Sequence, residues 1–159
     1  MSDRAAFVAS LRAEHQTLGE FCQVLEAEQA CLLRSDVDAL LQITQLKSSK
    51  VDRLAELADA RVGHLDALRL SAGRRGMTEW LAQHAGSDGP ELSKLWHEVV
   101  DFADKARSLN DSNGTLITTR LTHNQAALAA LQSAVRTHSL YGPDGQSSVA
   151  AGNRELGSA

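Results

Sequence analysis

Apolar residues recur every three or four positions along most of this chain, and this spacing predicts amphipathic α-helices. One such stripe predicts a long first helix from Phe7 to Leu32. Ser35 and Asp36 then stand directly before a new periodic run, and both residue types commonly cap helix N-termini. We therefore expect the first helix to end near Arg34 and to form an antiparallel hairpin with the second.

The stretch "SAGRRG" interrupts this pattern with two glycines. It is followed by at most a short helix, which we expect to be capped by Thr78 and ended by Gly86. A third long helix should begin near Pro90, because the missing N–H of proline costs nothing in a first helical turn. We expect this connector to be the least regular internal part of the chain.

The third helix contains Asn113-Gly114, a dipeptide that elsewhere is a strong turn signal. An apolar stripe nevertheless runs from Leu95 to Val135 at a step near ~3.6 and keeps its phase through the dipeptide. We expect one helix to about Leu140, about 75 Å long, beside partner helices of about 45 to 50 Å. The third helix should therefore extend beyond the hairpin.

These patterns predict an all-α fold with three long helices plus a short connector helix. In it, an antiparallel helical hairpin packs against a long C-terminal helix as an elongated bundle or coiled coil. Aromatic residues make up only 4% of the chain and it has two prolines, a composition typical of helical proteins. Residues 1–141 should form a single helical domain, and the Gly- and Ser-rich residues 142–159 a flexible tail.

The charge distribution excludes several classes of partner. The net charge is -4 and the basic residues are scattered, so the chain has no electrostatic footprint for nucleic acid. No apolar run approaches the ~18 residues of a membrane span, and no signal peptide opens the chain. We expect a cytoplasmic protein with no membrane insertion. Cys22 and Cys31 would lie about 13 Å apart on one helix, too far for a disulfide, and should be buried thiols.

Four charged residues fall on the apolar faces of the hairpin. Lys47 and Arg61 lie on the inner face of the second helix, and Glu14 and Glu28 on that of the first. They could pair across the hairpin. The commoner arrangement is a set of ordinary solvated charges at the edge of the seam, and that is what we expect here.

The chain lacks the residue patterns of common catalytic and metal sites. It has no Glu-x-x-His pair, no HExxH, no phosphate-binding glycine loop and no nucleophile elbow. Its six histidines are dispersed. We expect no catalytic residue, no bound metal and no cofactor, and hence a protein that is not an enzyme.

Three features of the C-terminal part could carry function. Asn110, Asn113 and Asn124 lie on or beside the apolar stripe, and Gly114 costs helix stability. Buried asparagines can fix helix register, and we expect Asn110, Asn113 and Gly114 to be such a lock, although they could also line a groove for a partner.

The second feature is the segment 112–140, which contains no acidic residue. If the hairpin is too short to cover it, it is an exposed apolar strip and a candidate partner site; otherwise the connector helix or a second copy covers it. The strip is formed by Leu116, Ile117, Leu121, Asn124, Leu128, Leu131 and Val135.

The third feature is Tyr141, the only tyrosine, which stands directly before a Pro-Asp-Gly turn. It either projects from the end of the helix or packs back onto it.

Three motifs in this order resemble the FlgN family of flagellar export chaperones: "LKSSKVDRLAELADAR" at 46–61, "LNDSNGTLITTRLTHNQAALAAL" at 109–131 and "LYGPDGQSSV" at 140–149. The family's Asn-x-x-Asn-Gly motif falls on Asn110, Asn113 and Gly114, and its Tyr-Gly-x-Asp-Gly motif on Tyr141 to Gly145. The connector is longer and richer in glycine than in the shortest members, and the tail lacks a strongly basic end.

This resemblance implies a cytoplasmic chaperone without ATPase activity. It would bind the C-terminal segments of the hook-filament junction proteins FlgK and FlgL through its last helix and deliver them to the type III export gate. The strip Leu116–Val135 would then be the cargo site, and Tyr141 would dock at the gate. The alternative is a non-enzymatic helical-bundle adaptor, or a structural protein that forms a homodimer through the third helix.

Overall fold

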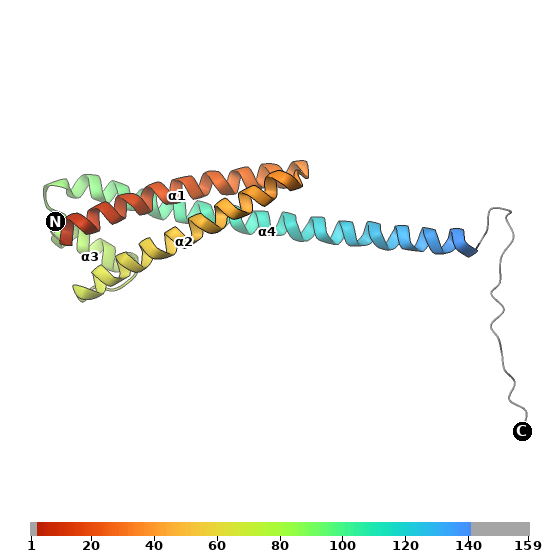
Figure 1. The fold of residues 1–159 in the computed structure, drawn as a ribbon. Coiled ribbons are helices and arrows are strands. Elements are labelled where there is room, and N and C mark those ends of the chain that lie inside the picture. The colour runs from red at the N-terminus through yellow and green to blue at the C-terminus, as the bar shows by residue number, and fades with distance from the viewer. Residues whose placement is uncertain (1–2, 141–159) are drawn as a thin grey trace, which may run out of the picture. The chain divides into compact units, whose positions relative to one another are not determined.

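The computed structural model describes the backbone of residues 3–140 and the side chains of residues 3–138. Tyr141 and the predicted tail 142–159 lie outside the described residues. The described part contains no strand, and the predicted all-α fold with three long helices and a short connector helix is confirmed (Figure 1). The elements are α1 (Asp3–Arg34), α2 (Val37–Ala67), α3 (Arg74–His84), the 3-10 turn η1 (Gly86–Asp88) and α4 (Gly89–Leu140).

The connection between α1 and α2 is as tight as the sequence predicts. Ser35 adopts a left-handed backbone conformation with φ of 58°, and its N–H donates to the Leu32 carbonyl, which closes α1. Asp36 then accepts a hydrogen bond from the backbone N–H of Ala39 at 3.2 Å. Asp36 is therefore the N-cap of α2, whereas Ser35 ends α1.

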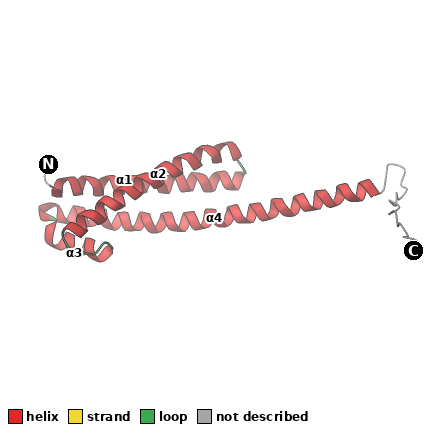
Figure 2. Cartoon of the chain, turned by 60° about the horizontal axis from the view of Figure 1, so that its bottom comes forward, coloured by secondary structure: helices red, strands yellow, loops and turns green. Residues whose placement is uncertain are grey.

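The chain divides into two units after Ile117, and the first unit is a helical bundle. In it α1 and α2 form an antiparallel hairpin, and the first part of α4 runs alongside α1 (Figures 1 and 2). Contacts between α1 and α4 advance along both helices together, so these two helices are parallel. They include Arg12–Glu91 at 3.0 Å, His15–Glu98 at 2.7 Å and Gln29–Ser112 at 3.3 Å.

The connector is the least regular internal part of the described chain, as expected, because residues 68–73 form turns and bends, but the helix α3 within it belongs to the core. Met77 and Trp80 of α3 are fully buried, at 0% and 1% exposure, against Phe7 of α1 and residues of α4. The helix starts at Arg74, before Thr78, with Gly73 as its N-cap. Gly76 therefore lies inside α3, where a Cβ atom would come within 1.6 Å of the Ser71 carbonyl oxygen.

Helix α2 buries less apolar surface than its periodicity suggests. Val37 and Val51 of α2 are exposed by 64% and 47%, and its C-cap residue Leu68 is exposed by 39%. Its buried apolar residues are Leu57 and Leu65, in the second half of the helix. The first half of α2 is instead attached to α1 largely through charged side chains.

The expectation that these charges are solvated was wrong. Glu14 is 5% exposed, and both of its oxygens accept hydrogen bonds from the Arg61 guanidinium, at 3.0 and 3.2 Å. That guanidinium also lies 5.2 Å from the ring centroid of Trp96. Glu28, likewise 5% exposed, pairs with Lys47 at 3.0 Å. Removing one partner of such a buried pair is costly, so these pairs constrain how α2 lies on α1.

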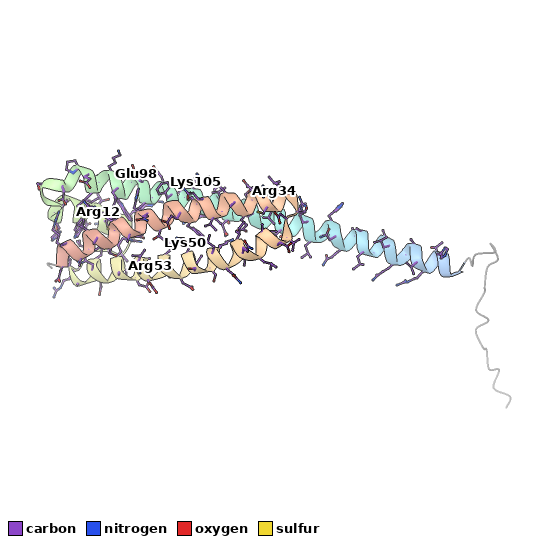
Figure 3. The ribbon with its side chains drawn as sticks, turned by 45° about the horizontal axis from the view of Figure 1, so that its top comes forward. Arg12, Arg34, Lys50, Arg53, Glu98 and Lys105 are labelled. Carbon is purple, nitrogen blue, oxygen red and sulfur yellow. The ribbon has the colours of Figure 1, made fainter. Side chains whose placement is uncertain are left out.

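Further ion pairs join α1 to both of its neighbours. Lys50 of α2 pairs with Glu20, and Lys105 of α4 pairs with Glu26 at 2.6 Å; Figure 3 labels both lysines, on opposite sides of α1. Both are more exposed than the Glu14–Arg61 pair, and exposed pairs contribute little to stability. Helix α1 is thus the element to which α2 and α4 both attach.

A histidine takes part in the aromatic core. The His64 ring stacks on Phe7 with a centroid distance of 4.0 Å, and Trp80 approaches it edge-on at 6.3 Å. Burial lowers the pKa of His64; the nearby Asp3 carboxylate opposes this shift and His84 adds to it. The folded protein therefore favours the neutral ring.

We predict that acid weakens the fold through His64. Above about pH 6.5 the ring is neutral in both states, whereas below it the unfolded chain binds a proton that the folded chain resists. The urea midpoint should therefore fall as the pH is lowered from 7.5 to 5.5, and His64→Gln should reduce that slope. His123→Gln, at an exposed position of α4, is the control and should keep the slope. An unchanged slope in His64→Gln would contradict the assignment.

Candidate functional site

The apolar stripe of α4 is buried over the first half of the helix. Leu92, Val99, Ala106 and Asn113 are all buried and follow one another at steps of seven residues. This heptad spacing is the one by which parallel helices pack side chains into one another's grooves. The parallel partner here is α1, which contributes Leu11, Leu18, Cys22 and Leu25.

Asn113 is the polar member of this buried stripe. It is 0% exposed, and its Nδ2 donates a hydrogen bond of 2.9 Å to the backbone carbonyl of Leu25. Its Oδ1 has no hydrogen-bond partner within the described residues. Because a buried amide is stable only where a partner is in reach, this contact favours one register of α1 on α4.

The other two predicted lock residues do not take part in this contact. Asn110 and Gly114 are exposed, and a Cβ atom built on Gly114 would meet nothing within 4 Å. The Asn-Gly dipeptide therefore lies inside a continuous helix, as its phase predicts, but neither Asn110 nor Gly114 is placed at the interface that Asn113 occupies.

The remaining apolar residues of the stripe are exposed. Leu116 is half-buried, and Ile117, the last residue of the first unit, is 47% exposed. In the second unit no side chain from 118 to 138 is buried. The exposed fractions there are 56% for Leu121, 56% for Leu128, 64% for Leu131 and 68% for Val135, and Asn124 is also exposed.

The spacing of these residues continues a coiled-coil seam. Leu121, Asn124, Leu128, Leu131 and Val135 follow one another at alternating steps of three and four residues, which places them on one face of α4. Between Leu121 and Val135 the only titratable residue is His123. This face is therefore a neutral apolar seam with one amide, a surface suited to an amphipathic helix.

The composition of this segment explains how it stays helical while exposed. Five alanines occur between residues 126 and 134, at positions 126, 127, 129, 130 and 134, and alanine has the highest intrinsic helix propensity. Because these residues lose little side-chain entropy in a helix, the segment needs less support from tertiary packing than a β-branched sequence would. A preformed helix also lowers the ordering cost of binding a partner.

We also considered metal sites, membrane spans and reactive thiols in the described part of the chain. Among the residues described, no three His, Cys, Asp or Glu side chains gather where they could hold a metal ion. Likewise, no described helix is long and apolar enough to cross a membrane. Cys22 and Cys31 are buried free thiols, as predicted, and burial raises the pKa of the Cys22 thiol, which keeps it protonated and poorly nucleophilic.

Sequence reasoning missed one groove, of about 580 Å³, between α3 and the start of α4. Its walls include Leu81, Trp96 and Val100, with Arg74 and His97 among its polar residues. The pattern in the connector predicted at most a short helix, and nothing in it indicated that this helix would form one wall of a groove with α4.

Comparisons with known proteins agree on one family. The model of the family described as "FlgN protein" matches residues 1–148. The flagella synthesis protein FlgN of Proteus mirabilis is 31% identical over 148 residues, covering 86% of this chain and 88% of the relative. That of Yersinia enterocolitica is 31% identical over 120 residues, covering 76% and 73%. No solved structure matches the chain.

The register contact of Asn113 leads to a prediction about stability. Asn113→Ala removes the hydrogen bond to Leu25 and leaves a small cavity, so it should lower the free energy of unfolding by about 1–3 kcal/mol. Asn110→Ala makes the same change one turn earlier at an exposed position and should stay within about 0.5 kcal/mol. Urea unfolding of both variants checks this, and equal effects would show that Asn113 has no special role.

Proposed function

This chain belongs to the FlgN family of flagellar chaperones, and from that premise we propose that it is a cytoplasmic export chaperone for the hook-filament junction proteins FlgK and FlgL. It binds their C-terminal segments, prevents their premature assembly or degradation, and delivers them to the flagellar type III export gate. Binding and release are equilibrium steps, so the mechanism has no catalytic step and no cofactor.

The observation that carries this proposal is the exposed seam of α4. Monomeric soluble proteins rarely leave a long row of large apolar side chains in water unless a partner covers it. Here Leu121, Leu128, Leu131 and Val135 are all more than half exposed on one helix face. A helix-prone cargo segment with its own apolar stripe fits such a face, and the proposed cargo site runs from Leu116 to Val135.

The energetics suit a chaperone that must later release its cargo. Covering the seam removes apolar surface from water at roughly 25 cal/mol per Å², and ordering a flexible cargo segment offsets part of that gain. A competing site at the export gate is then sufficient for release. We place that docking step at Tyr141, the residue that directly follows α4.

A second candidate use of the same seam is homodimerisation. A second copy could cover the exposed leucines, and the protein would then act as a structural or adaptor bundle. Cargo and self-association both bury the seam, so they are distinguished by whether a seam variant loses cargo, oligomeric state or both.

Leu128→Glu tests the cargo site. It places a charge in the middle of the seam, where cargo would have to bury it, and should weaken binding of the FlgK C-terminal segment at least about 50-fold by calorimetry. Because Leu128 is 56% exposed, the fold should be retained. Ser133→Glu adds the same charge on the opposite face of α4 and should bind like the wild type. Loss of dimerisation with cargo binding intact would instead favour the structural protein.

Tyr141→Ala tests the division of roles along the chain. If Tyr141 docks at the export gate, the variant should bind the FlgK and FlgL segments within about twofold of wild type while secretion of both proteins falls sharply. Pull-down and secretion assays in the same strain measure the two effects. Equal loss of binding and secretion would mean that Tyr141 belongs to the cargo site.

A further inference from the structure

The α1–α4 interface shows how this protein packs one helix on another. Two short side chains reach across it to main-chain carbonyls of the opposite helix. Asn113 Nδ2 donates to the Leu25 carbonyl at 2.9 Å, and the Cys22 thiol donates to the Phe102 carbonyl at 3.4 Å. The two helices therefore approach closely enough at this place for a side chain of one to hydrogen-bond to a main-chain carbonyl of the other.

Asn124 repeats the position of Asn113 on α4. The two residues are eleven positions apart, which is three helical turns at about 3.67 residues per turn, so they share a face of the helix. Each interrupts an apolar stripe with the same amide side chain. Asn113 is buried against α1, whereas Asn124 is exposed and lies between the exposed Leu121 and Leu128.

The surroundings of Asn124 favour a close neutral contact. Ala127 lies one turn further along α4, and a small side chain there lets another backbone come near. No carboxylate occurs from residue 112 to residue 140, so the seam itself supplies no acidic group to accept a hydrogen bond from the Asn124 amide. When a helix covers the seam, that amide loses water and must find an acceptor on the helix that covers it.

We infer that Asn124 is a positioning residue of the seam, which donates its side-chain amide to a main-chain carbonyl of the bound helix as Asn113 does to α1. The occupant is an amphipathic cargo helix with an apolar seam and a small side chain where it faces Asn124. This inference rests on the proposed function. Since every helix has main-chain carbonyls, such a contact tolerates cargo segments of different sequence, and the small cargo side chain that must face Asn124 sets the register.

The test replaces the amide by its isosteric carboxylate. Asn124→Asp loses the donor and places negative charge against the carbonyl, so it should weaken binding of both the FlgK and the FlgL C-terminal segments at least about tenfold. The control is Gln125→Glu in the full chain, which makes the same change of charge at the neighbouring position off the seam and should change either affinity less than threefold.

Leu128→Glu separates this inference from the proposed function. If Leu128→Glu abolishes binding while Asn124→Asp behaves like Gln125→Glu, the seam binds cargo but the donor role of Asn124 is wrong. If Asn124→Asp weakens only one of the two cargo segments, the acceptor is a cargo side chain, and the main-chain contact is also wrong. If Leu128→Glu has no effect, the seam is not the cargo site and the proposed function itself fails.

Discussion

The parallel packing of α1 on the first half of α4 is the constraint on which the other features depend. Helix α1 has 32 residues and α4 has 52, so α1 cannot supply a neighbour for every turn of α4. Buried apolar side chains and the Asn113 contact with Leu25 set the register of the pair. That register determines which leucines of α4 are buried within the bundle and which are left to face water.

Helix α2 is attached to α1 by a different kind of contact. Glu14 and Glu28 are buried and pair with Arg61 and Lys47 of α2, whose first half buries no apolar residue. Ion pairs of this kind add little net stability compared with apolar packing, but breaking one is costly. They therefore select how α2 lies on α1 without requiring a large apolar face on α2.

Periodicity predicted the long helices well, because each has a regular apolar stripe and the cap at Asp36 is local chemistry. Periodicity failed where the burial of a residue depends on a segment that is far away in the sequence. Gly76 indicated a break in the helical pattern, yet it lies inside α3 and packs against the backbone of Ser71. Trp80 of the same helix was not predicted to be a core residue, although it is buried. Among the candidate site residues, spacing predicted the apolar seam and drew attention to Asn113. Spacing could not predict that Asn113 is buried while Asn110 is exposed, because only the position of α1 distinguishes the two residues.

We propose that cargo covers the exposed half of α4. Hydrogen exchange of the full chain, followed by mass spectrometry with and without the FlgK C-terminal segment, tests it most directly. We expect cargo to slow exchange strongly in residues 117–138 and to change it little in α1 and α2. Protection confined to the bundle, with 117–138 exchanging equally fast in both samples, would contradict it.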